Sequence, residues 1–509
     1  MELDNPGLGN AGLDDPGHDA GLDNPGGEAF APGQLGSPEF LRDYGVRYAY
    51  AAGSMFRGIS SVDLVARMSQ AGLLAYFGTG GLPLETVEEA LTSLRQRVAA
   101  SHTFGMNLLC NPDRPEREEA VVSLLLRHDV RHIEAAAVTR VTPSLVRFRF
   151  SGAHRDAAGG AVALRHVMAK VSRLDIARTL LAPPPTELVN ALVAQGHLTR
   201  EEAEAAGELP VVSDLCAEAD SGGHTDRRNP QVLLPELRRL REDAMTRHGY
   251  AKRIRVGSAG GLGTPEAVAA AFVSGADFVV TGSVNQCTPE AGTSDAVKDL
   301  LAELDSEGTA FASSPELFEL GAQVQVVRRN TSFAPRANRL YQLYRTYDSL
   351  EAIEPRSARV VQEGWFGKSF EEVWEETRAH IAESRPHELE RAEKNPRHRM
   401  ALIFGWWFAR TTRAAVEGDV AGSPDFQVHC GPAMGAFNRY VAGGPLENWR
   451  HRHVDSVAEV LMGGAADVLS DLLARLRTPH AATVRNSRRG GRANTCSPEV
   501  LPLAVTGDQ

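Results

Sequence analysis

The chain has 509 residues, of which 42% are hydrophobic and 23% are charged, a composition typical of a globular protein with one to three domains. Its formal net charge of −11 excludes the basic field of a nucleic-acid-binding protein, so we expect no nucleic acid partner. Because the sequence has no apolar run of membrane-spanning length, no secretory signal pattern and five scattered cysteines without CxxC spacing, we expect a cytoplasmic protein with no membrane contact and no metal site.

The first forty residues differ from the rest of the chain. They contain eight acidic residues and no Lys or Arg, and they repeat the turn-forming segments LDNPG and LDDPG, which cannot bury apolar surface. GSPEF at 36–40 resembles a cloning linker. We therefore expect residues 1–40 to be a disordered leader foreign to the fold, with a natural interdomain linker as the alternative. Residues 478–509 lack periodicity and are expected to form a disordered tail.

Strand-like and helix-like segments alternate between residues 41 and 305. The strands are near-continuous apolar runs, as in parallel sheets covered on both faces, and lie at 47–53, 73–77, 103–109, 131–137, 165–171, 211–219, 253–257 and 277–282. Helices are expected at 60–72, with Ser60 as N-cap, and at 83–100, 117–129, 142–147, 232–245 and 264–276. Eight such units in about 250 residues predict an α/β fold, a TIM (β/α)8 barrel. The alternative is an open doubly wound sheet, whose usual GxGxxG turn is replaced by GSMFRG.

Two regions exceed a minimal barrel. Residues 181–209 are expected to form an inserted helical hairpin with one apolar face, made of Leu188, Val189, Leu192 and Val193. We expect the hairpin at the loop end of the barrel, where it either walls the ligand pocket or only covers the fold. Residues 306–477 have mainly helical periodicity and are expected to form a helical layer over the barrel mouth. Its aromatic cluster is more typical of a core than of a ligand site, and consists of Phe404, Trp406, Trp407 and Phe408.

The carboxyl ends of the predicted strands carry the candidate site, because TIM barrels place their chemistry there. These ends hold GSMFRG, GTGG, Asn107, Glu134, Lys170, EADSGGHTD, GSAGGLGTP and TGSVNQ. Glycine allows close backbone approach to a ligand, and a helix N-terminus attracts anions. The turns GSAGG and TGS therefore predict a phosphate site, which by itself does not distinguish a phosphorylated substrate from flavin mononucleotide (FMN).

Several of these motifs together resemble one family. GSMFRGISSVDLVARMSQAGLLAYFGTGGL, FGMNLLCNP, AKVSR, EADSGGHTD, GSAGGLGTPEA, TGSVNQCTPEAGTSD and CGPAMGAFN are similar to the PfaD family, the trans-acting enoyl reductases of polyunsaturated fatty acid and polyketide synthases. The similarity covers about residues 42 to 477. It implies an FMN-containing barrel that takes hydride from NADPH and reduces an enoyl thioester carried by an acyl carrier protein. It also implies that CGPAMGAFNRYV returns toward the active site and that some basic surface meets the carrier, with Arg328, Arg329, Arg336 and Arg339 as candidates.

On this basis we assign roles to the strand-end residues. Lys170 suits the negative edge of a reduced flavin, and Asn107 and Glu134 are candidate ring contacts, with a core amide and a structural ion pair as their alternatives. The phosphate is assigned to Gly260, Gly261, Gly282 and Ser283. The full cofactor-binding set is Gly53, Ser54, Met55, Asn107, Glu134, Lys170, Gly222, Gly223, Ala259, Gly260, Gly261, Gly282, Ser283 and Gln286.

His224 is the candidate proton donor, or the group that orients the substrate, and together with Lys170 it makes up the predicted catalytic pair. Gly222 and Gly223 would let the chain pass close to the cofactor. Asp220 and Asp226 either orient His224 or cap the following loop. Three functions remain open: an FMN- and NADPH-dependent enoyl reductase that acts on carrier-bound chains, with a homodimer as one candidate assembly; a nitronate monooxygenase that uses oxygen; and a barrel without chemistry that docks in an assembly line.

Overall fold

The computed structural model describes residues 29–110, 114–224, 226–315 and 317–477. The chain divides into two units, one made of residues 1–27 and 471–509 and the other of residues 28–470. The described part of the first unit is the end of helix α18 (Val454–Arg477). Everything below concerns the second unit. The predicted disorder of residues 1–28 and 478–509 lies outside the described residues.

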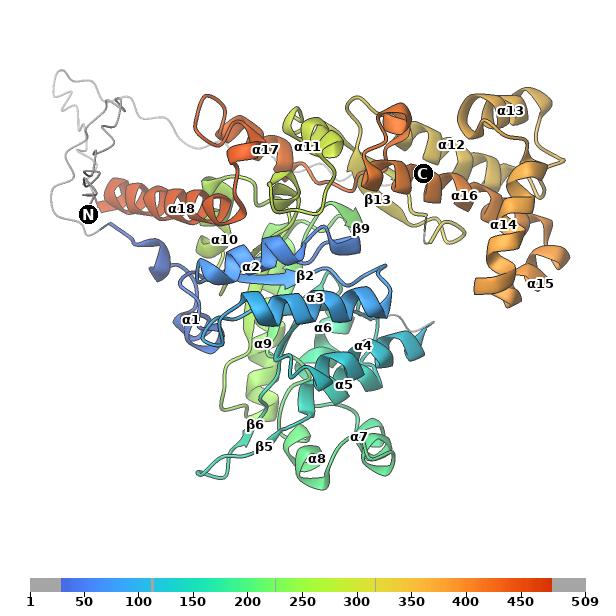
Figure 1. Ribbon diagram of the computed structural model, residues 1–509. Helices are drawn as coiled ribbons and strands as arrows, with labels where there is room; N and C mark the ends of the chain where they lie inside the picture. Colours follow the sequence, from blue (N-terminus) through green and yellow to red (C-terminus); the bar gives the residue numbers. More distant parts are fainter. Residues whose placement is uncertain (1–28, 111–113, 225, 316, 478–509) are drawn as a thin grey trace, which may run out of the picture. The chain divides into compact units, whose positions relative to one another are not determined.

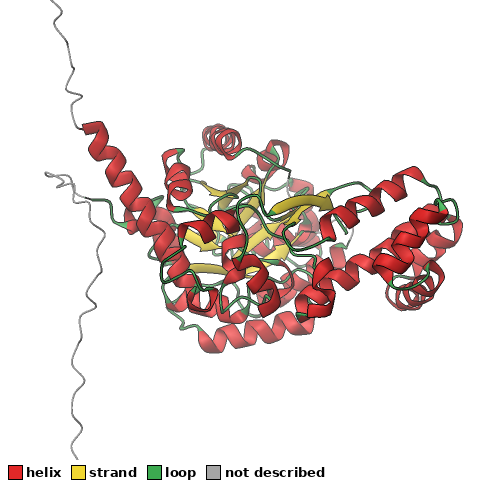
Figure 2. Cartoon of the chain, turned by 90° about the horizontal axis from the view of Figure 1, so that it is seen from above, coloured by secondary structure: helices red, strands yellow, loops and turns green. Residues whose placement is uncertain are grey.

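A closed barrel of eight parallel strands forms the centre of this unit, as predicted (Figures 1 and 2). Around the ring the strands follow the order β1, β11, β10, β8, β7, β4, β3, β2. Their bounds are β1 Tyr50–Ala52, β2 Leu74–Phe77, β3 Gly105–Leu109, β4 His132–Ala136, β7 His166–Val171, β8 Asp214–Glu218, β10 Arg255–Ala259 and β11 Val279–Thr281. Each coincides with one of the apolar runs, since parallel strands are buried on both faces. The doubly wound alternative is excluded by the pairing of β1 with β11.

An outer helix follows each barrel strand, and all of these helices except α6 and α11 lie at the predicted places. They are α2 Val62–Gln70, α3 Leu84–Arg97, α4 Pro115–Arg127, α5 Pro143–Phe150, α6 Leu174–Leu181, α9 Pro230–His248, α10 Pro265–Val273 and α11 Asp295–Ala302. The predicted N-cap of α2 was wrong by one residue. Ser61 accepts the hydrogen bond from the Leu64 N–H, whereas the Ser60 hydroxyl donates to the Gly53 carbonyl and thereby fastens the turn after β1.

The amino end of the barrel is closed by residues that we had assigned to a disordered leader. The short helix η1 (Pro32–Gln34) and helix α1 (Pro38–Tyr44) are both ordered. Phe40 is fully buried, and its ring centroid lies 4.7 Å from that of Phe278. The Tyr44 hydroxyl donates to Asp214, which also holds Arg255 at 2.5 Å. The leader prediction is therefore wrong for residues 29–40, because Phe40 supplies apolar surface that plugs the barrel.

The helical insertion lies at the end of the barrel opposite to the one we expected. Helices α7 (Thr186–Ala194) and α8 (Arg200–Ala206) follow α6, and so stand where the chain returns to the amino end of β8. Val189 and Leu192 pack there against Val146 and Phe150 of α5, beside the small hairpin β5 (His154–Arg155) and β6 (Ala161–Val162) (Figure 1). The apolar face was predicted correctly, but the hairpin covers the base of the barrel and cannot wall its mouth.

The region after residue 305 begins with two strands that periodicity did not predict. Strands β12 (Thr309–Ser313) and β13 (Gln323–Val327) form an antiparallel sheet with the short strand β9 (Gly223–His224). The helices that follow are α12 Phe333–Thr346, α13 Pro355–Arg359, the π-helical η4 Val360–Phe366, α14 Phe370–Ser384, α15 Pro386–Lys394, α16 Pro396–Glu417 and α17 Ala433–Tyr440. Helices α12 to α16 share a separate core that includes Phe404, Trp407 and Phe408, with Trp406 packed at its edge, as predicted. Helix α17 instead packs Met434 and Phe437 into the barrel core.

No helix among the described residues is long and apolar enough to cross a membrane. Within the same residues, no group of three or more His, Cys, Asp or Glu side chains is placed to hold a metal ion. The cysteines Cys110, Cys216, Cys287 and Cys430 are buried and unpaired, and burial raises the pKa of each thiol.

Candidate active site

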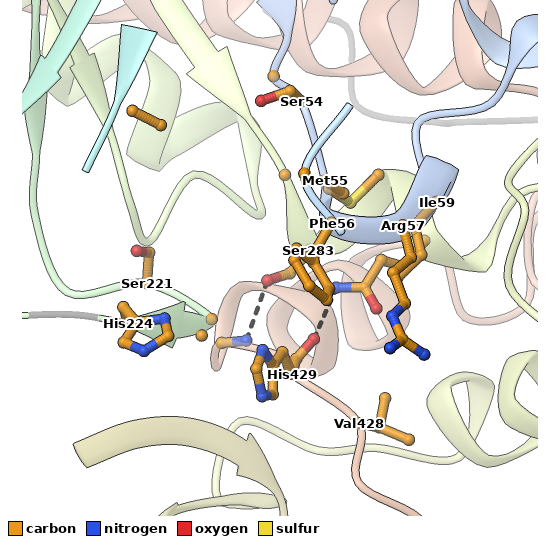
Figure 3. Close-up of a pocket in the computed structure, with 18 of the residues that line it drawn as sticks. Ser54, Met55, Phe56, Arg57, Ile59, Ser221, His224, Ser283, Val428 and His429 are labelled. Atoms are coloured by element: carbon orange, nitrogen blue, oxygen red, sulfur yellow. Dashed lines mark hydrogen bonds between the residues drawn. The ribbon is translucent and has the colours of Figure 1, made fainter. Parts of the chain in front are cut away.

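A cavity of about 390 Å³ opens at the carboxyl ends of the barrel strands (Figure 3). It is lined from below by strand ends and from above by the later segments, which include the end of α16 and residues 427–433. Of the fifteen residues predicted for the site, all but Glu134 line it. The segment CGPAMGAFNRYV returns to the cavity through Gly431 and Ala433, as the family resemblance implied.

The glycine turns after β10 and β11 leave a cradle at one side of the cavity. The two turns are adjacent, since Ala259 pairs with Val280. Gly260 and Gly261 have φ values of 93° and 73°, which favour glycine. A Cβ atom on Gly261 or Gly282 would meet nothing within 4 Å. Helix α10 begins directly beyond this cradle, with Thr264 as its N-cap, and its N-terminus provides a positive potential. The space, the backbone and the charge therefore fit a phosphate.

Lys170 supplies a positive charge at the base of the cavity. Its Nζ atom lies 3.8 Å from Glu134 Oε2 and 3.6 Å from Glu218 Oε1. Burial by itself lowers the pKa of Lys170, but the negative charges of Glu134 and Glu218 outweigh that effect and raise it above its ordinary value. The side chain is therefore a fixed cation, and it will not serve as a proton donor near neutral pH.

Glu134 lies one layer behind the cavity and is not among the residues that line it, and its contact with the cofactor stays a prediction. The carboxylate is 0% exposed. Its Oε2 atom accepts hydrogen bonds from the backbone N–H and the hydroxyl of Ser54. Glu134 thus holds Ser54 and Lys170, two residues that do line the cavity, and the ion-pair alternative describes it correctly.

Asn107 combines both of the interpretations that the sequence allowed. The Asn107 Nδ2 donates to the backbone carbonyl of Glu134 at 3.0 Å, and the Thr79 hydroxyl donates to the backbone carbonyl of Asn107 at 2.9 Å. The side chain is therefore a hydrogen-bonded core amide, only 5% exposed, whose exposed edge contributes to the cavity wall.

His224 stands at the rim, on strand β9. Its Nε2 atom lies 2.9 Å from the Ser314 hydroxyl, and its ring centroid lies 6.4 Å from that of His429, edge to face (Figure 3). Pairing of His224 with Val324 of β13 fixes its backbone. The passage of Gly222 and Gly223 close to a cofactor stays a prediction, and the structure shows a further close contact at Gly222. A Cβ atom on Gly222 would lie 2.8 Å from the Cys430 backbone, so Gly222 allows the chain to pass that segment.

Asp226 accepts a hydrogen bond from the Ser172 hydroxyl. Among the arginines proposed for carrier contact, Arg336 is ion-paired with Asp425 at 2.6 Å and Arg329 with Asp305 at 3.0 Å. Arg328 and Arg339 are exposed. None of the four lines the cavity.

Several cavity residues were missed from the sequence. His429 and Gln427 contact each other at 3.0 Å and come from a segment with no strand or helix pattern. Thr412, Ala415 and Val416 belong to α16, whose amphipathic pattern marks a buried face but not a pocket. Arg57 was visible, since it lies inside the GSMFRG turn that we had singled out.

Comparison with known proteins identifies the family. Residues 44–339 match the family model of nitronate monooxygenase, and residues 347–426 match the inserted helical domain of [acyl-carrier-protein] S-malonyltransferase. The enoyl reductase domain of MlnA, from the macrolactin biosynthesis cluster of Bacillus amyloliquefaciens, is 40% identical; the match covers 87% of this chain and 99% of that one, with a TM-score of 0.84. The chain is a PfaD-type member of the nitronate monooxygenase family.

PfaD-type relatives occur within larger proteins. "Polyketide biosynthesis protein PksE" of Bacillus subtilis is 42% identical over 88% of this chain, and "Polyketide biosynthesis protein ThaF" of Burkholderia thailandensis is 46% identical over 86% of it. The chain spans 58% and 37% of the length of these two relatives. FabK from Thermotoga maritima, at 17% identity and a TM-score of 0.51, shares the fold.

Proposed function

We propose that this PfaD-type chain is an FMN-dependent enoyl reductase that acts in trans on acyl chains bound to a carrier protein, with NADPH as hydride source. The observation that carries the proposal is the cavity itself, which has an open glycine cradle, a half-buried cation and a rim histidine around one space. The likeness to the MlnA enoyl reductase domain supports the reaction class.

The residues present fit FMN. The cradle of Gly260, Gly261, Gly282 and Ser283 would hold the phosphate through backbone N–H groups, because added side-chain atoms at Gly261 and Gly282 would occupy space that is open. Lys170 would lie at the base, where a fixed cation stabilises the negative edge of a reduced flavin. Gly53, Ser54, Met55 and Asn107 would contact the ring from the β1 and β3 ends, and Ala259 and Gln286 would complete its surroundings.

When bound, FMN would accept a hydride from NADPH and pass it to the β-carbon of the enoyl thioester. The balance is one enoyl thioester, one NADPH and one proton giving one saturated thioester and NADP⁺. The protein therefore has to stabilise negative charge on the thioester oxygen and allow a proton to reach the α-carbon.

His224 is our candidate for that task. Its ring borders the cavity, and the Ser314 hydroxyl fixes one ring nitrogen at 2.9 Å, so the imidazole is held in one orientation at the rim. A donor in that position would stabilise the developing enolate or protonate it. Strand β9 lines this side of the cavity through Gly223 and His224, and its pairing with β13 would hold it in place there.

We further propose acyl carrier protein domains as partners. The likeness of residues 347–426 to a helical domain of an enzyme named for its carrier substrate supports this, as does the likeness to PksE and ThaF. We keep the predicted division into a barrel at 41–305 and a substrate- or carrier-facing region at 306–477, but now include residues 29–40 in the barrel unit. A homodimer and a cytoplasmic location remain predictions.

The test is a product assay. Purified protein supplied with FMN, NADPH and a crotonyl pantetheine thioester should consume NADPH and form the butyryl thioester in equal amounts. A protein that cannot take up FMN would instead support the docking-barrel alternative.

The second candidate is nitronate monooxygenase activity, favoured by the family model over residues 44–339. The same preparation should then take up oxygen with an alkyl nitronate and leave NADPH unused. Because the two reactions consume different second substrates, the two assays separate them.

A further inference from the structure

Arg57 occupies a strained position at the mouth of the cavity. It belongs to the short helix η2 (Phe56–Gly58), directly after β1, and has φ 53° and ψ 36°. A non-glycine residue in this left-handed region carries a conformational cost and persists only where the surroundings fix it. The surroundings here do so, because the Arg57 N–H donates to the Gly80 carbonyl at 2.8 Å and the Gly58 N–H to the Gly78 carbonyl at 3.0 Å. The backbone thus presents one arginine in one place.

The charge of Arg57 is also unlike that of the other cation in the cavity wall. Lys170 is held between two carboxylates. Arg57, by contrast, is exposed and has no carboxylate oxygen within 4 Å among the residues that the structure describes. Its guanidinium carbon lies 5.7 Å from the ring centroid of Phe56, whose side chain is 42% exposed. An unpaired guanidinium at the edge of a cavity is suited to an anionic ligand group.

The direction of the side chain places that group at the entrance. In Figure 3 Arg57 extends from η2 toward Val428, on the opposite side of the opening from His224. The wall around it is apolar, with Phe56, Ile59 and Val428 lining the cavity. Arg57 follows β1, which pairs with β11, so the Arg57 turn neighbours one of the two turns that form the glycine cradle. A ligand that meets Arg57 therefore has an apolar part within the cavity and an anion at its rim.

We propose that Arg57 binds the phosphate of the phosphopantetheine arm that carries the acyl chain. The proposal rests on the proposed enoyl reductase function, since that function brings such an arm to the cavity. Guanidinium and phosphate match in geometry and form paired, charge-assisted hydrogen bonds. The arm carries its phosphate at the end remote from the thioester, so a thioester near His224 leaves the phosphate at the entrance. Arg57 would then recognise the carrier-bound form of the substrate.

The experiment compares crotonyl-phosphopantetheine with crotonyl-pantetheine, two thioesters that differ only in the phosphate. The variant Arg57→Gln removes the charge, and Arg247→Gln, an exposed residue in the last turn of α9 at the base of the barrel, is the matched control. For wild-type protein and both variants the KM of each thioester, the KM of NADPH and the Kd of FMN are measured. Binding of phosphopantetheine without an acyl group is measured by calorimetry, which does not depend on turnover.

We expect Arg57→Gln to raise the KM of crotonyl-phosphopantetheine and the Kd of phosphopantetheine about tenfold, as for the loss of one charge-assisted hydrogen bond. The KM of crotonyl-pantetheine, the KM of NADPH and the Kd of FMN should stay unchanged. Added salt should raise the KM of crotonyl-phosphopantetheine in wild type but not in the variant. An increase confined to the KM of NADPH would assign Arg57 to the nucleotide phosphate and overturn the proposal. A higher Kd for FMN, or equal effects on both thioesters, would overturn it too. If wild type reduced neither thioester, the proposed function would fail, while the calorimetry would still decide on Arg57.

Discussion

His224 Nε2 and the Ser314 hydroxyl lie 2.9 Å apart, although the two residues are ninety positions apart in the chain. His224 lies on strand β9, in the segment after barrel strand β8, and Ser314 follows strand β12 of the later region. The sheet formed by β9, β12 and β13 therefore joins the barrel to the later region at the point where the candidate proton donor stands. The orientation of His224 depends on residues outside the barrel.

Replacing His224 separates the two halves of the reaction. In His224→Gln we expect FMN to remain bound and to be reduced by NADPH at the wild-type rate, because the cradle and Lys170 are untouched. Reoxidation by a crotonyl thioester should slow by roughly 10²–10³-fold, the usual effect of losing a general acid or an oxyanion donor. Stopped-flow absorbance measures both steps. Ser314→Ala should slow only the second step, by less, and should change its pH profile; equal slowing of both steps would contradict the assignment.

The Lys170–Glu134 pair predicts different effects on stability and on chemistry. Lys170→Met leaves the buried carboxylate of Glu134 without its cation, which should cost roughly 2–4 kcal/mol of unfolding free energy. The double variant Lys170→Met with Glu134→Gln removes the stranded charge and should regain most of that stability. In both variants the rate of reduction of bound FMN by NADPH should nevertheless be about tenfold or more below the wild-type rate, because both lack the cation. Recovery of the reduction rate in the double variant would show that Lys170 serves stability alone.

Gly282 offers a test of the phosphate cradle that spares the fold. Its backbone (φ −128°, ψ −77°) is not in the left-handed region that requires glycine, and a Cβ atom there would meet no protein atom within 4 Å. Gly282→Ala should therefore unfold at the wild-type temperature without FMN but bind FMN about tenfold more weakly, since the methyl group would crowd the phosphate. Gly463→Ala, whose Cβ atom also points into open space but on α18, is the control. Unchanged FMN affinity in Gly282→Ala would place the phosphate elsewhere.

The base of the barrel predicts sensitivity to acid. Burial lowers the pKa of His132 to about 4 and places that of His166 well below its ordinary value. The unfolded chain, in which histidine titrates near pH 6.5, binds these protons first, so stability is lost as the pH falls from about 6.5 toward 4. His132→Asn should lose roughly 1–2 kcal/mol less than wild type between pH 7 and pH 5. Urea unfolding at the two pH values measures this; an equal loss in both proteins would contradict it.

Much of the barrel was predictable because each strand is a nearly continuous apolar run and most of the helices between strands have apolar residues at helical spacing. Cavity residues were found for a related reason: in a parallel barrel all strand ends meet at one mouth, so Asn107, Lys170 and Gly260 had to converge. Glu134 shows the limit of this reasoning. Alternation along β4 does not tell whether a polar side chain reaches the cavity or stops one layer behind it.

The errors have physical reasons. Residues 29–40 were assigned to the disordered leader because the segment before Phe40 is rich in turn-forming residues and has no Lys or Arg. Phe40 and Tyr44 make up only one apolar helix turn, which is too short to give a clear helical periodicity. The α7–α8 insertion was placed at the wrong end of the barrel because the direction of the chain was not taken into account. Helix α6 runs back to the amino end of the barrel, so a hairpin that follows α6 lies at that end. His429 was invisible because its position depends on an isolated bridge to Val326, which no local pattern encodes.

The central claim is that the cavity holds FMN and passes a hydride from NADPH to an enoyl thioester. The most direct measurement is the absorbance spectrum of the protein with FMN under anaerobic conditions, first with one equivalent of NADPH and then with excess crotonyl-phosphopantetheine. Our account predicts that the yellow band is lost with NADPH and returns fully with the thioester, with butyryl product equal to the flavin present. A band that stays lost with the thioester and returns only when oxygen is admitted would contradict it.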